Sequence, residues 1–157
     1  MLMEEPPNKE TGLISEQSMR YKYFENRQYA KGTPASLNPL REVIISIRGL
    51  REIFYLSPDI PLRIGRFDLS SPSIDFDLSV YGAEKLGVSR LHAKLELDRH
   101  HNIYLTDMGS TNGTRLAGNV LRAYQPNLVK DGDEILLGFL LMTIYLTKPQ
   151  DDLEIGV

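Results

Sequence analysis

The sequence predicts an all-β protein, and three observations lead to this fold class. Short runs of β-branched and aromatic residues recur through the second half of the chain, and Gly, Pro, Asn and Asp separate them. No helical period fills the intervals between these runs. Residues 74–78 and 93–98 alternate apolar with charged side chains, as half-buried strands do. Such a pattern is typical of a sandwich or barrel, and we expect a two-sheet antiparallel β-sandwich.

The strands follow from where the apolar runs begin and where the turn residues end them. In chain order they are expected at 43–47, 53–56, 62–64, 74–78, 93–98, 103–106, 114–116, 135–137 and 139–146. Asn112-Gly113 is the strongest two-residue signal for a tight hairpin turn, so it places residues 109–114 at a loop tip between two strands. The side chains expected in the core are Leu95, Leu97, Leu105, Ile135, Leu137 and Ile144.

The chain is expected to contain one folded domain between two tails. Residues 1–41 combine prolines and charges with few aliphatic side chains, a composition that buries little. They are predicted to form a flexible or weakly structured tail. Residues 15–30 also carry a helical pattern, so a short helix there remains an alternative. Residues 42–148 are predicted to form the domain, and residues 149–157 an acidic C-terminal tail.

Composition excludes several classes of function. The 157 residues, 41% of them apolar, suit one domain, and the formal net charge of −3 gives no electrostatic footprint for nucleic acid. The chain has no cysteine, which excludes disulfides, zinc ribbons and thiol catalysis and fits a reducing compartment. No apolar run approaches the roughly 18 residues that a membrane helix needs. The acidic, proline-bearing start is unlike a signal peptide, so a cytoplasmic protein is expected.

Three predicted loops carry the residues that suit a bound anion. Arg66 follows a predicted strand, and Ser89 and Arg90 precede another. The third loop, 110–112, presents two hydroxyls and an amide. Arginine forms bidentate, charge-assisted hydrogen bonds to a phosphate dianion, and hydroxyl and backbone N–H groups can bind the remaining oxygens. Together the three loops favour a phosphate monoester as ligand.

The spacing of these motifs resembles that of a forkhead-associated (FHA) domain over roughly residues 42–148. The motifs that carry the resemblance are Gly65-Arg66, Ser89-Arg90-x-His92, Ser110-Thr111-Asn112-Gly113-Thr114, and Asp131-Gly132-Asp133 with Gly138. The resemblance implies a β-sandwich of about eleven strands, whose loops at one end bind a phosphothreonine peptide. FHA domains are among the modules that read phosphorylated motifs through arginine clusters.

The resemblance also implies a role for each matching residue. Arg66 and Ser89 would bind the phosphate, with Arg90 as a second polar or basic contact. Thr111 would shape the slot for the threonine methyl group, and Asn112 would bond the peptide backbone. The residues implied to support the site rather than contact the ligand are Gly65, His92 and Gly113.

Two departures from the family pattern affect expectations of specificity. Many relatives have Asn-Gly where this chain has Ala117-Gly118, so the preference for residues beyond the phosphothreonine is open. The loop at 67–88 is also longer than the corresponding loop usually is in this family. Its residues 81–85 could line a peptide groove or pack on the scaffold, and we favour packing.

The function expected from the resemblance is a phosphothreonine-peptide-binding signalling module that recruits phosphorylated partners. It implies no catalytic activity, no cofactor and no metal. The partner would be a phosphothreonine-containing protein, such as a Ser/Thr kinase or its substrate, and neither nucleic acid nor a membrane. The alternative is a phosphate-independent interaction or self-association scaffold with the same fold.

Two further functions can be built from single residues. Ser89, His92 and Asp107 could act as nucleophile, base and orienter, but no Gly-x-Ser-x-Gly elbow accompanies them. His92 with His100 and His101 could bind a metal, although an adjacent pair points to opposite faces of an extended chain. Both alternatives are weaker than the phosphopeptide interpretation.

The N-terminal tail gives one further expectation. Thr11, and Thr33 before Pro34, are threonines in the predicted flexible segment. Phosphorylation of either could let the tail bind its own domain, because a tethered segment has an effective concentration on the order of millimolar. Neither threonine lies in a motif that requires this.

Overall fold

The computed structural model describes residues 40–70 and 73–147, which form an almost entirely β structure with one short 3-10 helix, η1 (Ser79–Tyr81). The expectations for the two tails lie outside these residues. No helix in the described ranges is long and apolar enough to cross a membrane. The strands are β1 (Arg41–Ile47), β2 (Leu50–Leu56), β3 (Leu62–Gly65), β4 (Phe76–Asp77), β5 (Ala93–Leu97), β6 (Ile103–Asp107), β7 (Thr114–Leu116), β8 (Asn119–Val120), β9 (Asn127–Leu128), β10 (Glu134–Leu137) and β11 (Leu140–Leu146).

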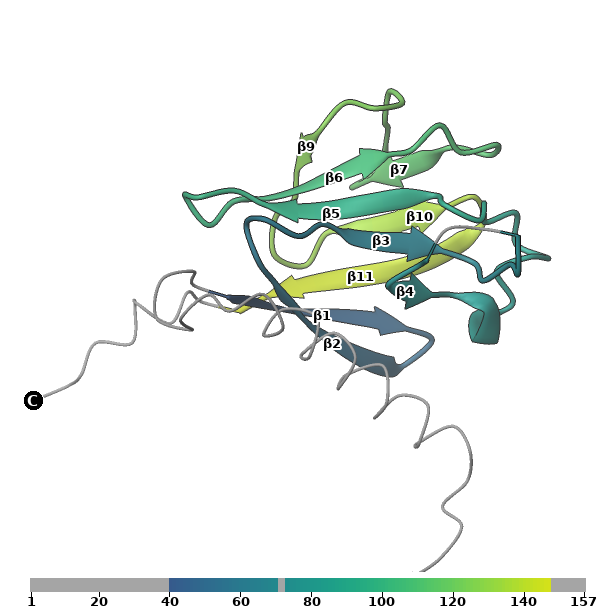
Figure 1. Ribbon diagram of the computed structural model, residues 1–157, viewed down its shortest axis with the longest axis horizontal. Coiled ribbons are helices and arrows are strands. Elements are labelled where there is room, and N and C mark those ends of the chain that lie inside the picture. The colour runs from purple at the N-terminus through teal and green to yellow at the C-terminus, as the bar shows by residue number, and fades with distance from the viewer. Residues whose placement is uncertain (1–39, 71–72, 148–157) are drawn as a thin grey trace, which may run out of the picture. The chain divides into compact units, whose positions relative to one another are not determined.

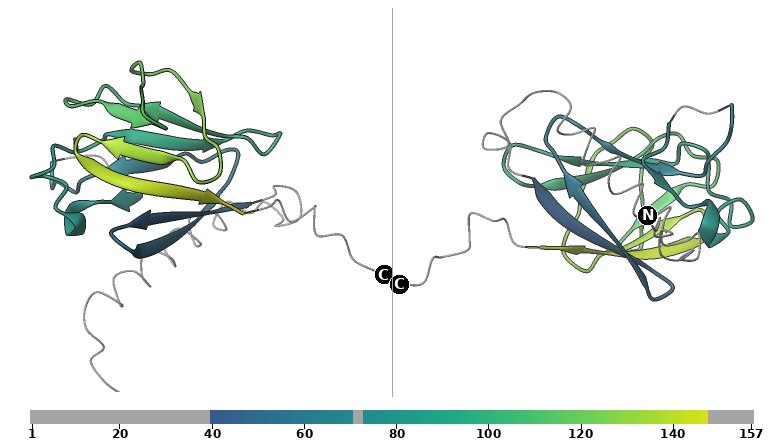
Figure 2. Two further views of the ribbon diagram at one scale, coloured as in Figure 1. Left: turned by 180° about the vertical axis from the view of Figure 1, so that it is seen from behind. Right: turned by 60° about the horizontal axis from the view of Figure 1, so that its bottom comes forward.

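The strands form two sheets that pack face to face. One has six strands in the order β2-β1-β11-β10-β7-β8, and the other has five in the order β4-β3-β5-β6-β9. In Figure 1, β3, β5 and β6 lie in front of β10 and β11, and the view from behind in Figure 2 reverses this order. The predicted two-sheet sandwich is therefore confirmed.

Alternating side chains of both sheets fill the space between them. In β1, Val43, Ile45 and Ile47 are fully buried, while Ile44 and Ser46 are only half-buried. Ile45 pairs with Ile144 of β11, which brings two buried aliphatic side chains together across the ladder. All six predicted core residues are buried, which confirms that part of the pattern.

Three short strands differ from the prediction. The expected strand at 74–78 is reduced to the two residues of β4, and it pairs parallel with β3, an exception to the antiparallel sheet. Strands β8 and β9 were not predicted. Strands β8 and β9 are each two residues long, too short for alternation to be visible in the sequence. At 74–78 the alternation is visible, but only Phe76 and Asp77 pair with β3.

Asn112-Gly113 does not form the predicted hairpin turn. It connects β6 of the five-stranded sheet to β7 of the six-stranded sheet, so the flanking strands do not pair with each other. Gly113 has a φ of 81°, but Asn112 is not among the residues with positive φ. Tight two-residue turns with both φ values positive lie instead at Ala117-Gly118, between β7 and β8, and at Arg48-Gly49, between β1 and β2.

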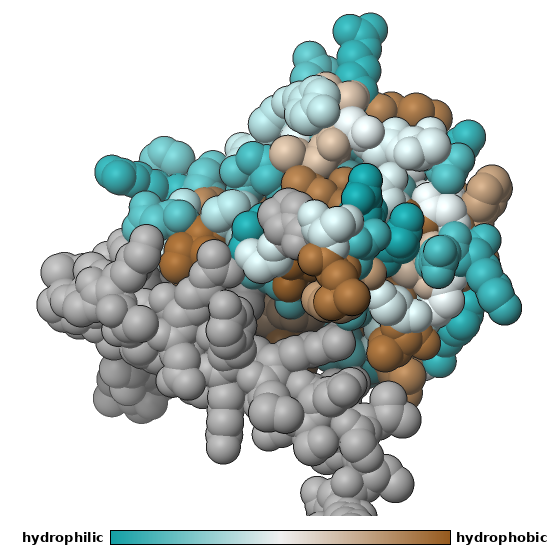
Figure 3. Space-filling view, turned by 45° about the vertical axis from the view of Figure 1, so that its right-hand side comes forward, coloured by the Kyte–Doolittle hydropathy of each residue, from teal (hydrophilic) through white to brown (hydrophobic). Residues whose placement is uncertain are grey.

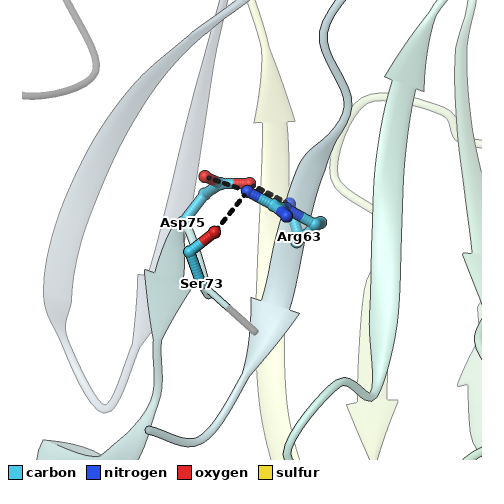
Figure 4. A network of polar contacts seen from close by, with 3 residues as sticks. All are labelled: Arg63, Ser73 and Asp75. Atoms are coloured by element: carbon cyan, nitrogen blue, oxygen red, sulfur yellow. Dashed lines mark hydrogen bonds and ion pairs between the residues drawn. The ribbon is translucent and has the colours of Figure 1, made fainter. Parts of the chain in front are cut away.

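A polar network holds the edge of the five-stranded sheet. The Arg63 guanidinium of β3 donates to both carboxylate oxygens of Asp75, at 3.0 and 3.2 Å, and to Ser73 Oγ at 3.0 Å (Figure 4). The Arg63 backbone N–H also donates to Asp75 Oδ2. These bonds fix the segment that precedes β4 against the end of β3, where the candidate site begins.

The long loop before β5 packs on the scaffold, as favoured from the sequence. Tyr81 and Ala83 are 4% and 0% exposed. The Tyr81 ring meets Phe76 edge to face, and its hydroxyl donates to Glu52 Oε1 at 2.7 Å. Residues 81–83 therefore pack on the scaffold, and the loop meets the β10–β11 turn again at Leu86.

Candidate functional site

The predicted site residues lie on loops that gather at one end of the sandwich. These loops follow β3, precede β5, connect β6 to β7, and connect β10 to β11. They lie at the right-hand end of the domain in Figure 1. Figure 3 is turned toward this end and shows apolar groups set among hydrophilic ones. The exposed apolar side chains of these loops include Phe67, Leu69 and Phe139.

Gly65 allows the end of β3 to approach the loop before β5. A Cβ atom at this position would lie 1.9 Å from the Arg90 carbonyl oxygen and 2.9 Å from that of Ser89. The backbones are joined on either side of this contact, because Arg66 N–H donates to Ser89 O at 3.2 Å and His92 N–H to Ile64 O at 2.9 Å. Only glycine fits here, so Gly65 brings Arg66 and Ser89 together.

His92 links two of the loops through its fully buried ring. Its Nδ1 accepts a hydrogen bond from the Ser89 backbone N–H at 3.0 Å, and its Nε2 lies 2.9 Å from Gly113 O, to which it can donate. This arrangement uses the neutral ring with the proton on Nε2. Burial lowers the pKa of His92, although the Gly113 carbonyl and Asp107 oppose this effect.

Asp107 shapes the loop that connects β6 to β7. Its carboxylate accepts hydrogen bonds from the hydroxyls of Ser110 and Thr114, at 2.5 and 2.6 Å, and from the backbone N–H groups of Gly109 and Ser110. Burial opposes ionisation, but the hydrogen bonds of Ser110 and Thr114 outweigh it, so the pKa of Asp107 falls below its usual value. The carboxylate therefore holds residues 109–114 in one arrangement.

The two site loops are also joined by side chains predicted to bind the ligand. Ser89 Oγ accepts a hydrogen bond from the Thr111 backbone N–H at 3.1 Å, and Asn112 Nδ2 donates to Gly87 O at 2.9 Å. Thr111 and Asn112 are both exposed. The structure thus brings Ser89, Thr111 and Asn112 to one surface.

The tip of the β10–β11 turn closes against the same loops. Gly138 N–H donates to Gly113 O at 3.0 Å, and Phe139 N–H donates to Leu86 O at 2.8 Å. The Phe139 side chain stays 71% exposed and lies near Gly87. The sequence analysis placed Phe139 in a strand and missed this position, since only tertiary contacts put it beside the site.

The two arginines differ in how they are held. Arg66 is half-buried, and its Nε donates to Val88 O at 2.9 Å, which fixes the direction of the guanidinium. Its two terminal nitrogens make no hydrogen bond to any residue that the structure describes. Arg90 is exposed, and its Nη1 donates to Ser70 Oγ at 3.3 Å. Arg66 therefore presents two oriented terminal nitrogens, while Arg90 is an exposed cation at the edge, held by one long hydrogen bond.

The geometry does not match the catalytic and metal alternatives. Both ring nitrogens of His92 face backbone groups, so neither is positioned to take a proton from Ser89 Oγ. His100 and His101 lie in the turn after β5, whereas His92 precedes that strand, so the strand separates them. The sequence analysis considered Asp107 only as a catalytic orienter, and missed its role in shaping the loop.

The comparisons with known proteins identify the family. Residues 62–138 match the family model described as the FHA domain. The chain carries an FHA domain. This match contains every motif on which the resemblance rested, from Gly65-Arg66 to Gly138.

Solved structures agree with this assignment. The N-terminal FHA domain of Rad53p from S. cerevisiae, in complex with a phosphothreonine peptide, is 25% identical over 68% of this chain and 94% of its own, with a TM-score of 0.54. An engineered FHA domain with the Myc-pTBD peptide is 26% identical over 71% of this chain and 94% of its own, with the same TM-score. The FHA domain of CT664 from Chlamydia trachomatis, 15% identical, covers 69% and 99% with a TM-score of 0.53 and shows the fold alone. No curated protein matches the chain.

Proposed function

We propose that this FHA domain binds phosphothreonine peptides and thereby recruits phosphorylated protein partners, without catalysing a reaction. The observation that carries the proposal is the orientation of Arg66, whose Nε is held by the carbonyl of Val88, the residue before Ser89, while its two terminal nitrogens make no hydrogen bond within the described residues. A guanidinium held in this way can form a bidentate, charge-assisted pair with a phosphate. An FHA domain solved with a phosphothreonine peptide, 25% identical to this chain, and one described by its phosphothreonine-dependent interactions, 26% identical, support the same ligand class.

The surrounding groups suit the rest of such a ligand. Ser89 Oγ accepts a hydrogen bond from the Thr111 backbone N–H and has its own proton to donate to a phosphate oxygen. Arg90 is exposed at the rim, where a second cation would contact the phosphate and attract it from solution. In this proposal Thr111 contacts the threonine methyl group and Asn112 bonds the peptide backbone. The partner would be a phosphothreonine-bearing protein, such as a Ser/Thr kinase or its substrate.

A pull-down from a degenerate phosphothreonine peptide library tests activity and preference together. Wild-type protein should enrich phosphorylated peptides over an identical unphosphorylated library, and the enriched positions would define the residue preference. Arg66→Ala should abolish enrichment. Arg99→Ala is the matched control, because this exposed arginine lies in the turn after β5, at the opposite end of the strand from the site.

One observation favours the phosphate-independent scaffold as a second candidate. On the outer face of the six-stranded sheet, Ile44 of β1 pairs with Ile53 of β2 and with Tyr145 of β11. Ile53 and Tyr145 are 45% and 42% exposed, and Leu141 of β11 is 50% exposed. Exposed apolar side chains grouped on a sheet face are typical of interaction surfaces. A sedimentation coefficient that rises with protein concentration in the wild type, and stays constant in Tyr145→Lys, would support self-association through this face.

A further inference from the structure

The segment that follows Arg66 turns back toward the two arginines of the site. Ser70 is exposed, and its Oγ accepts the hydrogen bond from Arg90 Nη1 at 3.3 Å. The Ser70 hydroxyl and backbone N–H both donate to Asp68 Oδ1, at 2.6 and 2.8 Å. A chain of hydrogen bonds therefore runs from Arg90 through Ser70 to Asp68.

The same segment already holds a negative charge within the field of the arginines. The hydrogen bonds from Ser70 lower the pKa of Asp68, and the positive charges of Arg90 and Arg66 lower it further. Burial opposes these effects and is larger than the contribution of either arginine, so the hydrogen bonds from Ser70 dominate the shift in pKa. A negative charge at this point of the loop is thus attracted by both residues that are proposed to bind the phosphate.

We propose that Ser70 is a modification site, and that a phosphoryl group on its Oγ occupies the arginine site in cis and excludes the phosphothreonine peptide. This inference rests on the proposed function. A protein kinase would transfer the γ-phosphoryl group of ATP to Ser70, forming the Oγ–P bond and breaking the bond to the β-γ bridging oxygen. ADP leaves, and the hydroxyl proton passes to the kinase base.

The geometry makes Arg90 the first contact of such a group. Its Nη1 already lies 3.3 Å from the oxygen that would carry the phosphorus. A phosphoserine adds about −1.5 to −2 charges at neutral pH and three acceptor oxygens, so it forms charge-assisted hydrogen bonds where the hydroxyl forms a weak one. Repulsion between this phosphate and the Asp68 carboxylate would release Asp68 from its present bonds to Ser70.

Tethering gives the modified residue an advantage over an external peptide. A segment joined to its site has an effective concentration on the order of millimolar, whereas short phosphopeptides bind FHA-sized sites with a Kd of about 1–100 μM. If the peptide binds with a Kd of about 10 μM and the isolated phosphoserine ten times more weakly, at about 100 μM, a millimolar effective concentration weakens peptide binding about tenfold. We therefore expect phosphorylation of Ser70 to weaken peptide binding about tenfold or more.

Ser73 provides a matched control three residues further along. It is also exposed, but its Oγ accepts a hydrogen bond from Arg63 Nη2 at 3.0 Å rather than from Arg90 (Figure 4). The Arg63 guanidinium belongs to the network with Asp75 at the edge of the five-stranded sheet. Phosphoserine at position 73 thus adds the same charge close by while engaging a different arginine.

The test compares three forms of the 157-residue chain. The first is unmodified, the second carries phosphoserine at position 70, and the third carries phosphoserine at position 73. Calorimetric titration with a phosphothreonine peptide enriched from the degenerate library should show about tenfold or greater weakening for phosphoserine 70 only. Equal affinity of the first two proteins, or equal weakening by phosphoserine at either position, would overturn the inference. Thermal melts of all three proteins establish that each is folded.

A second measurement needs no peptide and separates this inference from the proposed function. In ³¹P spectra, Arg90→Ala and Arg66→Ala should each move the phosphoserine 70 resonance and its pH titration, and leave those of phosphoserine 73 unchanged. If phosphoserine 70 is unaffected by both substitutions, the inference is wrong whether or not peptides bind. If no peptide binds to the unmodified protein while the resonance moves, the proposed function fails and the cis contact stands.

Discussion

Gly65 and Arg90 approach so closely that a Cβ atom on the glycine would lie 1.9 Å from the arginine carbonyl oxygen. This contact joins the end of β3 to the loop before β5, and it determines where Arg66 lies relative to Ser89. Packing between the end of β3 and the loop before β5 therefore determines the backbone positions at the site. The side chains proposed to bind the ligand extend from these backbone positions.

Replacing Gly65 with alanine should therefore disturb both the fold and the site. The added methyl group forces β3 away from the loop, and overpacking of this kind costs about 1–3 kcal/mol of unfolding free energy. Denaturant melts should show this loss together with loss of phosphopeptide binding. Gly82→Ala is the control, because Gly82 has a φ of 76° but open space around its Cβ position. Its backbone strain should cost about 1 kcal/mol and leave peptide binding intact.

His92→Ala should destabilise the protein by roughly 1–3 kcal/mol, because it leaves the part-buried Ser89 N–H without its acceptor and removes one of the two donors to the Gly113 carbonyl. Thermal or denaturant melts measure this effect. His100→Ala, at an exposed position, should change stability by less than about 0.5 kcal/mol. An unchanged melt together with abolished binding would mean that His92 contacts the ligand directly, contrary to its proposed supporting role.

The lowered pKa of His92 predicts a specific pH dependence of stability. Below pH 6.5, the usual pKa of histidine, the unfolded chain takes up a proton at His92 while the folded protein keeps the ring neutral. Stability should therefore fall as the pH decreases from about 6.5 toward the lower pKa of the folded state. Replacing His92 with asparagine should flatten the wild-type slope in this window, whereas His100→Asn should not. A wild-type slope preserved in His92→Asn would contradict the prediction.

Ala117 occupies a conformation that suits asparagine better than alanine. Its φ is 48°, in the first position of the two-residue turn between β7 and β8, where both residues have positive φ. Ala117→Asn should raise the unfolding free energy by roughly 0.5–1 kcal/mol, because asparagine tolerates the left-handed region. Chemical denaturation checks this, with Ala123→Asn as the control at an exposed position without positive φ. Equal or lower stability in Ala117→Asn would contradict it.

The sequence was sufficient for features that depend on local pattern. Alternation predicted the strands and the buried side chains such as Leu95 and Ile144, and motif spacing predicted the loops that gather at one end. The sequence was not sufficient where tertiary contacts determine the path of the chain. Asn112-Gly113 has the local signature of a hairpin. The hydrogen bond that Thr114 donates to Asp107 and the contact of Gly113 with His92 instead direct the chain across to the other sheet.

The parts of the site that the sequence missed are held by residues far apart in the chain. Phe139 reaches the site because its backbone bonds to Leu86, 53 residues earlier (139 − 86). Ser70 meets Arg90 across 20 residues. Neither pair has a local signature, since loop residues of this kind are polar or apolar without period.

The most direct test of the central proposal is calorimetric titration of one peptide in its phosphothreonine and unphosphorylated forms. Wild-type protein should bind the phosphorylated form with a Kd of roughly 1–100 μM and the other form not measurably. Arg66→Ala should lose about 2–3 kcal/mol of binding free energy, and Ser89→Ala or Asn112→Ala about 1–2 kcal/mol each. A phosphoserine version should bind about 1–3 kcal/mol more weakly, because the methyl slot stays empty. Equal affinity for the two forms, or wild-type affinity in Arg66→Ala, would contradict the proposal and favour the phosphate-independent scaffold.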